Sequence, residues 1–186
     1  MNERILPSPT LNTIFITKEV SNSPLISEML TLCQNLQRMG LIEKEYGTIS
    51  LDYGKRILIN AKQVDLKKIT PQDIVEIVDY DPLKNIMMVI GLKDPATEAP
   101  VHWIIQKARH DINALLQISS ISLYEKFKNT FPTTEKETPP TSLERAKDIL
   151  KTLRNGKTIL IKNEGILFAG LTIKEITGTL THHFRV

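Results

Sequence analysis

Cysteine is almost absent from this sequence, whose 186 residues include only Cys33. One thiol cannot form an internal disulfide, so nothing supports an oxidising compartment. Long apolar runs are also missing, and no stretch approaches the ~20 residues that a membrane-spanning helix needs. The N-terminus lacks a basic segment followed by an apolar stretch, so no signal peptide is predicted. We therefore expect a cytoplasmic protein with no membrane partner.

A large excess of charge is lacking too, because the formal net charge is only +3. The basic residues are scattered, and pairs such as Lys67-Lys68 are typical of solvated edges of secondary structure. We therefore expect no nucleic-acid partner. The sequence does have an ordinary globular composition, with 41% hydrophobic and 24% charged residues. Its length suits one domain with a sizeable core.

Apolar periodicity predicts strands and helices in alternation. Clusters of β-branched and aromatic residues predict strands over residues 10–20, 48–51, 56–60, 74–79, 86–91, 113–118, 157–162 and 166–169. Helices are predicted over 23–40 with Ser23 as N-cap, over 100–108 with Trp103, Ile104 and Ala108 inward, over 141–153 with a capping box beginning at Thr141, and over 173–184. Residues 129–140 predict a loop. Tight turns between strands favour a largely antiparallel sheet covered by helices, an α/β fold of the α+β type.

Seven short segments follow one another in an order that characterises a known family; they are residues 32–41, 47–50, 58–63, 66–75, 95–102, 109–114 and 162–165. Gly47-Thr-Ile-Ser50 resembles a Gly-Asn-x-Ser loop, and residues 95–102 resemble Pro-Ser-Ser-Glu-x-x-x-His. Through these segments the chain resembles the class II aldolase/adducin family from about Leu32 to Ile176. The resemblance implies a central, mainly antiparallel sheet between helical layers, and a homo-oligomer, commonly a tetramer. We expect the family domain over residues 23–186, preceded by an N-terminal extension over 1–22 with an extra strand.

The family's enzymes use a divalent metal, usually zinc, to hold the substrate oxygens during reversible aldol cleavage. The resemblance places their His-x-His pair on Gln117 and Ser119, and their third histidine on Glu164. An amide, a hydroxyl and a carboxylate are hard-oxygen donors that suit tight zinc binding poorly. We therefore expect no metal and no cofactor. The alternative is a hard cation such as Mg²⁺ or Ca²⁺ in an atypical site with Glu98, Glu164, Gln117 and water as ligands.

The family's acid/base glutamate, which handles the carbon proton, falls on Glu98. Two interpretations remain, because a carboxylate in the first turn of a helix also interacts favourably with the helix dipole. The family's phosphate-binding glycine falls on Gln63, which removes a flexible turn. A small anionic ligand can still be bound by a group of polar side chains: Thr48, Ser50, Asn60, Lys62 and Thr97.

Four further residues receive structural interpretations. Cys33 lies on the apolar face of a predicted helix and should be a buried, inert thiol. We expect a hydrogen-bonded structural role for His102, an exposed position for His110 and a packing role for Tyr124.

Three hypotheses about function follow from the resemblance. The first is a degenerate family member, a pseudoenzyme, that acts by binding or by oligomeric assembly. The second is an aldehyde-lyase or isomerase that acts through Glu98 on a small hydroxy-carbonyl or sugar-phosphate substrate. The third is a regulatory domain that binds a small anion. Whether the protein is an enzyme stays open at this point.

Overall fold

The computed structural model describes residues 10–42, 47–154 and 156–184. Its elements in chain order are β1 (Asn12–Thr17), α1 (Ile26–Arg38), β2 (Gly47–Tyr53), β3 (Arg56–Asn60), two short 3₁₀ turns (Leu66–Lys68 and Pro71–Asp73), β4 (Ile74–Asp81), β5 (Ile86–Ile90), α2 (Ala99–Ala108), β6 (Ala114–Ser119), α3 (Ile121–Phe127), α4 (Leu143–Leu153), β7 (Thr158–Ile161), β8 (Gly165–Gly170) and α5 (Ile173–His183). Within these ranges, every helix is too short or too polar to cross a membrane.

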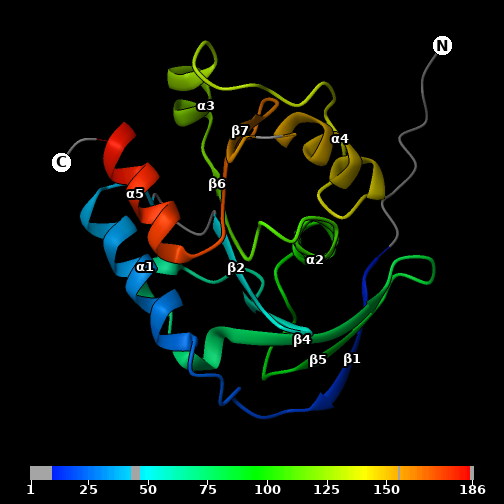
Figure 1. Cartoon of the computed structure of the whole chain (residues 1–186). Coiled ribbons are helices and arrows are strands. Elements are labelled where there is room, and N and C mark those ends of the chain that lie inside the picture. The colour runs from blue at the N-terminus through cyan, green and yellow to red at the C-terminus, as the bar shows by residue number, and fades with distance from the viewer. Residues whose placement is uncertain (1–9, 43–46, 155, 185–186) are drawn as a thin grey trace.

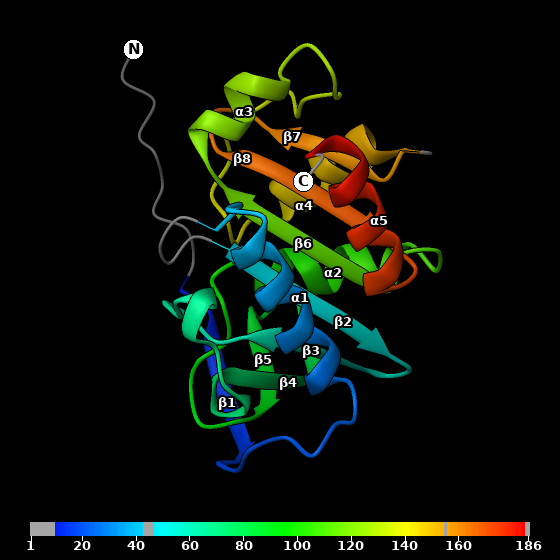
Figure 2. The same cartoon turned by 90° about the vertical axis from the view of Figure 1, so that its left-hand side faces the viewer.

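A single eight-stranded sheet runs through the molecule in the order β1-β5-β4-β3-β2-β6-β8-β7. β1 and β5 are parallel, and the other neighbouring strands of this sheet pair antiparallel. Figure 1 shows α1 and α5 on one face of the sheet, and α2 and α4 on the other; Figure 2 shows α1 and α5 lying across the strands. The predicted α/β fold, a mainly antiparallel sheet between helical layers, is confirmed.

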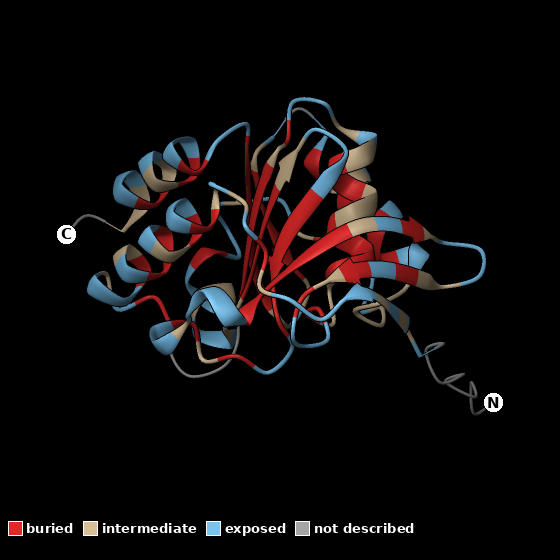
Figure 3. Ribbon diagram, turned by 90° about the horizontal axis from the view of Figure 1, so that it is seen from below, coloured by how far each residue is buried: buried red, intermediate tan, exposed pale blue. Residues whose placement is uncertain are grey.

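Apolar side chains fill the space on both sides of the sheet. Figure 3 shows buried residues along the strands and on the sheet-facing stripes of the helices. In α1 the buried positions recur at helical spacing: Ile26, Met29, Leu32, Cys33 and Leu36. The predicted burial of Cys33 is confirmed, and burial raises the pKa of its thiol to about 12. Tyr124 packs against the same core and His110 is exposed, as predicted.

Two helix starts differ from the prediction. α1 begins after Leu25, because Ser23 and Pro24 form a turn before the helix in which the Ser23 hydroxyl accepts the N–H of Leu25 at 3.3 Å. α4 is capped by Ser142, whose hydroxyl accepts the N–H of Arg145 at 3.1 Å. The N-cap is therefore Ser142 and not Thr141, and the predicted capping box is absent, because Arg145 at the third helical position has no acceptor for the second hydrogen bond.

The inward face of α2 was predicted only in part. Trp103 and Ile104 are half-buried and pack against the core, but Ala108 is exposed. The fully buried positions include Val101, His102, Ile105 and Gln106. Two of these residues, His102 and Gln106, are polar, and they can be buried because each forms a hydrogen bond with Ser50 on β2. The short helix α3, which begins after the Ser120 N-cap, was not predicted.

The two edge strands of the sheet, β7 and β1, differ in whether another segment lies along them. The segment that follows α3 runs along β7, where Leu160 donates its N–H to the carbonyl oxygen of Pro132 and accepts the N–H of Thr134. This segment belongs to the loop predicted over residues 129–140, which is confirmed apart from a single β-bridge at Thr133. At the opposite edge, β1 falls inside the strand predicted over 10–20. Residues 1–9 of the predicted extension lie outside the described residues.

Candidate functional site

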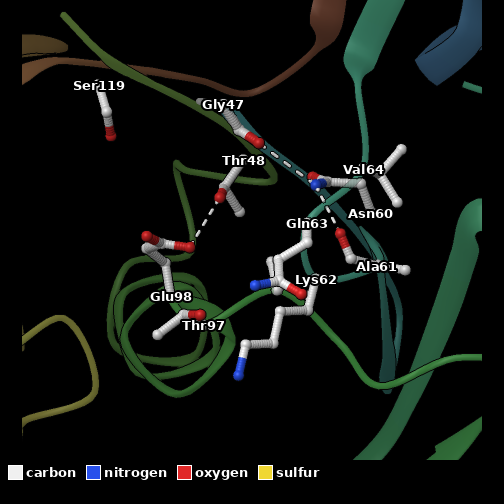
Figure 4. A pocket seen from close by; sticks show the side chains of 11 residues that line it. Gly47, Thr48, Asn60, Ala61, Lys62, Gln63, Val64, Thr97, Glu98 and Ser119 are labelled. Carbon is white, nitrogen blue, oxygen red and sulfur yellow. Dashed lines mark hydrogen bonds between the residues drawn. The ribbon is translucent and has the colours of Figure 1, made fainter. Parts of the chain in front are cut away.

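A cavity of about 280 Å³ opens where β2 and β3, the end of β6 and the start of α2 come together. Figure 4 shows the side chains around it. Five residues chosen from the sequence lie in its wall, namely Thr48, Asn60, Lys62, Thr97 and Glu98. Ser119, one of the former metal-ligand positions, also lines the cavity, together with Gly47, Ala61, Gln63, Val64 and Ala96. The resemblance thus identified residues that the fold places around one hollow.

Glu98 points toward the interior of this cavity. It occupies the N-cap position of α2, yet its side chain accepts no hydrogen bond from the first turn of that helix. Its Oε2 instead accepts the hydroxyl of Thr48 at 2.9 Å (Figure 4). The side chain therefore makes no capping hydrogen bond, although the helix dipole favours its negative charge at this position. Both sequence-based interpretations, the dipole interaction and the acid/base role, are compatible with a carboxylate that faces the cavity.

Asn60 fixes the shape of the cavity wall. It is only 2% exposed, and its Oδ1 accepts the N–H of Ile49 at 2.7 Å. Its Nδ2 lies 3.2 Å from each of the carbonyl oxygens of Gly47 and Ala61 (Figure 4). The side chain therefore joins the end of β3 to the start of β2, and its polar groups are already engaged by backbone.

The turn after Asn60 keeps a left-handed residue although the glycine is missing. Gln63 has φ 58°, a conformation that costs a residue with a Cβ about 1 kcal/mol or more. The expected loss of this turn therefore did not occur, and the backbone bends as a glycine would allow. The turn presents Lys62 at the cavity, with its backbone N–H held by the carbonyl oxygen of Asp94 at 2.9 Å.

Ser50 lies behind the cavity rather than in its wall. It is completely buried, with its hydroxyl 2.8 Å from His102 Nδ1 and donating to Gln106 Oε1 at 3.0 Å. Burial lowers the pKa of His102 to about 3, so the imidazole is neutral. The predicted structural role of His102 is confirmed, and the structure places Ser50 in the same buried group instead of against a ligand.

The three former metal-ligand positions lie at the end of β6 and in the β7–β8 turn. Gln117 Nε2 donates to Glu164 Oε1 at 2.8 Å. The guanidinium of Arg145, on α4, also pairs with this carboxylate: Nη1 donates to Oε1 at 3.2 Å and Nη2 donates to Oε2. Gly165 leaves no room for a side chain against the backbone of β6, so the turn carrying Glu164 lies tightly on that strand.

These residues do not fit a zinc ion. Both oxygens of Glu164 are held by Arg145, and the fixed positive charge beside them repels a divalent cation. Across residues 10–42, 47–154 and 156–184, no group of three or more His, Cys, Asp and Glu side chains could hold a metal ion. The positive charge of Arg145 beside the Glu164 carboxylate is equally unfavourable to Mg²⁺ and Ca²⁺ at this position.

Arg145 was not singled out from the sequence, although one signal pointed to it. It lies one turn before Ile149 on the buried stripe of α4, and its side chain is only 5% exposed. A charged residue on the apolar stripe of an amphipathic helix needs a buried partner, so this position could have been recognised as unusual.

The fold agrees with the comparisons to known proteins. The family model described as "Class II Aldolase and Adducin N-terminal domain" matches residues 27–122, so the chain belongs to the class II aldolase and adducin family. No curated protein matches the chain.

Several solved structures share the fold. An L-fuculose 1-phosphate aldolase is 19% identical, with a TM-score of 0.69 and 90% of each chain covered. The L-fuculose-1-phosphate aldolase from Thermus thermophilus is 18% identical, with a TM-score of 0.62 over 86% of this chain and 94% of that one. The sugar-phosphate aldolase from Thermotoga maritima is 15% identical, with a TM-score of 0.61 over 84% and 91%. At these identities the similarity establishes the fold alone.

Proposed function

We propose that this member of the family is a pseudoenzyme with respect to zinc-dependent aldol cleavage, and that it binds a small anionic ligand as a cytoplasmic homo-oligomer. One observation carries the proposal. At the position of the third metal ligand, the Glu164 carboxylate is held by Arg145 and Gln117. A carboxylate neutralised in this way is a poor ligand for a divalent ion, so these positions do not favour the metal that Lewis-acid stabilisation of an enediolate requires.

The cavity supports binding of a small polar anion. The exposed ammonium of Lys62 and the hydroxyl of Thr97 lie in the same wall (Figure 4) and are donors suited to a phosphate or carboxylate group. Glu98, in the same cavity, offers acceptors for hydroxyl groups of the ligand. The expected ligand is therefore a hydroxylated organic anion that meets Lys62 with its charge and Glu98 with its hydroxyls.

Calorimetric titration with inorganic phosphate and with glycerol 1-phosphate tests this assignment at low ionic strength. Lys62→Met should weaken binding of both by about 10-fold, the effect of losing one charge-assisted contact of ~1.4 kcal/mol. Lys68→Met, which removes an exposed lysine outside the cavity, is the matched control and should leave binding unchanged. Equal weakening by both substitutions, or no binding of either anion, would refute the ligand assignment.

The orientation of Glu98 favours a second candidate function. A carboxylate that faces the cavity instead of capping its helix could act as acid/base in a metal-independent aldehyde-lyase or isomerase reaction on a hydroxy-carbonyl or sugar-phosphate substrate. Turnover of dihydroxyacetone phosphate and L-fuculose 1-phosphate should be assayed for the wild-type protein and for Glu98→Gln. We expect no turnover by either protein, whereas activity that Glu98→Gln abolishes would replace the pseudoenzyme proposal.

Metal content and assembly complete the test of the proposed function. Elemental analysis of purified protein should find no stoichiometric divalent metal, and one zinc per chain would contradict the proposal. Sedimentation analysis should give a multiple of the 21.1 kDa chain mass, with four copies expected from the family resemblance. A strict monomer at all concentrations would contradict the assembly part alone.

A further inference from the structure

Arg145 is a charged residue buried between α4 and the β7–β8 turn. Its side chain is 5% exposed, whereas that of its partner Glu164 is 27% exposed. The adjacent Ala146 and the following Ile149 are fully buried in the core beneath α4. A guanidinium at such a position is tolerated only when its charge is compensated by a hydrogen-bonded partner.

The compensating group belongs to a short chain of polar contacts whose last member, Gln117, lies two residues from Ser119 in the cavity wall. Arg145 pairs with Glu164, and Glu164 accepts a hydrogen bond from Gln117 at 2.8 Å. Gln117 and Ser119 point to the same side of β6 because side chains two residues apart on a strand share a face. Ser119 lies in the cavity wall. Hydrogen bonds thus join Arg145, Glu164 and Gln117, and Ser119 continues the same face of β6 to the edge of the cavity.

We infer that Arg145 is a fixed internal cation that takes the place of the family's metal ion. Its guanidinium neutralises Glu164, occupies both carboxylate oxygens and opposes the entry of a divalent ion into the group of side chains formed by Gln117, Ser119 and Glu164. The inference rests on the metal-free part of the proposed function. It goes further in assigning the exclusion of metal to one residue on a different helix, in addition to the replaced histidines.

A purely structural ion pair would have a different consequence. If Arg145 only fastened α4 to the β7–β8 turn, a restored metal site would compete successfully for Glu164 and would bind zinc with Arg145 still present. Glu164 is itself a good zinc ligand once freed, and one carboxylate with two imidazoles is a ligand set used for zinc. Restoring two imidazoles on β6 while keeping or removing Arg145 therefore separates the two roles.

The test begins with Gln117→His/Ser119→His, to which Arg145→Met is then added. Zinc binding is measured by calorimetry and by the metal content after dialysis against trace zinc. We expect no stoichiometric zinc in the first protein. With Arg145→Met added, we expect one zinc per chain and binding at least about 100-fold tighter, because a cation close to a dication is removed and Glu164 is released.

Matched variants keep the result interpretable. Lys151→Met in the same double-histidine protein removes an exposed cation of α4 and should not create a zinc site. Arg145→Gln is a second neutral replacement that keeps a polar side chain, and it should act like Arg145→Met. Adding Glu164→Leu to the zinc-binding variant should abolish binding. Circular dichroism establishes that each variant is folded before titration.

Two outcomes would overturn the inference. The first is equally tight zinc binding with Arg145 present, which would show that its charge excludes nothing. The second is failure of both folded neutral variants, Arg145→Met and Arg145→Gln, to bind zinc, which would show that the positions do not form a metal site. Phosphate titration of the wild-type protein and of Lys62→Met is independent of both outcomes, so failure of the proposed ligand site remains distinguishable.

Discussion

At the scale of single residues, one residue in the cavity wall has a backbone conformation that is unfavourable for any residue with a Cβ atom. Gln63 is held in the left-handed region at φ 58°. We predict that Gln63→Gly will raise the free energy of unfolding by about 0.5 to 1 kcal/mol, since relief of the strain exceeds the added flexibility of the unfolded chain. Urea denaturation measures the change. Asn163→Gly is the matched control at φ 53°, and because asparagine tolerates this region its gain should be smaller. A loss of stability in Gln63→Gly would contradict the strain.

A buried carboxylate away from the cavity governs stability in acid. Glu76, on β4, accepts hydrogen bonds from the Ser21 hydroxyl at 2.6 Å and from Arg56. Burial raises the pKa of Glu76, but hydrogen bonds from Ser21, Arg56 and Tyr53 outweigh this effect and hold its pKa below the usual 4.5. Because the folded-state pKa is the lower one, the stabilisation is present above pH 4.5 and is lost as pH falls through the folded-state pKa.

We therefore predict that Glu76→Gln will lower the free energy of unfolding by about 2 kcal/mol at pH 7, because it removes charged hydrogen bonds. The difference from the wild-type protein should shrink steadily as the pH falls below 4.5, where the wild-type carboxylate becomes protonated. Urea denaturation across this pH range measures both effects. Glu28→Gln, at an exposed position of α1, is the control and should change the free energy of unfolding little at pH 7 or at acidic pH. A difference that does not depend on pH would refute the role of the carboxylate's charge.

At the scale of elements, the start of α4 tests a one-residue shift between sequence and structure. The hydroxyl of Ser142 accepts the N–H of Arg145. We predict that Ser142→Ala will destabilise the protein by about 1 kcal/mol, the usual effect of losing an N-cap, and that Thr141→Ala will cost less. Thermal and urea unfolding of the two variants provide the comparison. A larger loss of stability in Thr141→Ala than in Ser142→Ala would support the capping box at Thr141 that the sequence predicted.

Most elements were predictable because they follow local rules. The buried stripe of α1 recurs at helical spacing, and the strands consist of apolar runs separated by tight turns. α3 was missed because its 7 residues form barely two turns and have no clear apolar stripe. The inward face of α2 was predicted only in part, because the buried polar residues His102 and Gln106 find their hydrogen-bond partner in Ser50, which lies about 50 residues earlier in the chain.

The candidate site was only partly predictable, because some of its contacts join residues that are far apart in the sequence. The resemblance located Glu98, Thr48 and Lys62, and the fold places them in one cavity. The contact of Arg145 with Glu164 depends instead on how α4 packs against a turn 19 residues away, with β7 between them. No local pattern encodes that contact, so the sequence-based expectation of no metal rested only on the missing histidines.

At the scale of the whole molecule, the continuous sheet links the cores on its two faces. We predict one cooperative unfolding transition in urea. Trp103, the single tryptophan, reports on α2 by fluorescence, while circular dichroism reports on the whole chain. The two transitions should coincide, and a separate early loss of tryptophan signal would show that the layer containing α2 unfolds independently.

The boundary between an extension over 1–22 and a domain over 23–186 stays a prediction.

The unequal edges of the sheet limit how copies of this chain can associate. At β7 the segment near Pro132 and Thr134 already takes up the hydrogen bonds of Leu160, while in the described part of the chain β1 is the opposite end of the sheet, with Ile14 and Ile16 exposed. An association that joined sheets edge to edge would thus use β1 from both partners, related by a two-fold axis. Among the described residues, such a contact would use the outer edge of β1 in both partners. It would close at two copies, so this mode of association does not continue into an open-ended fibre.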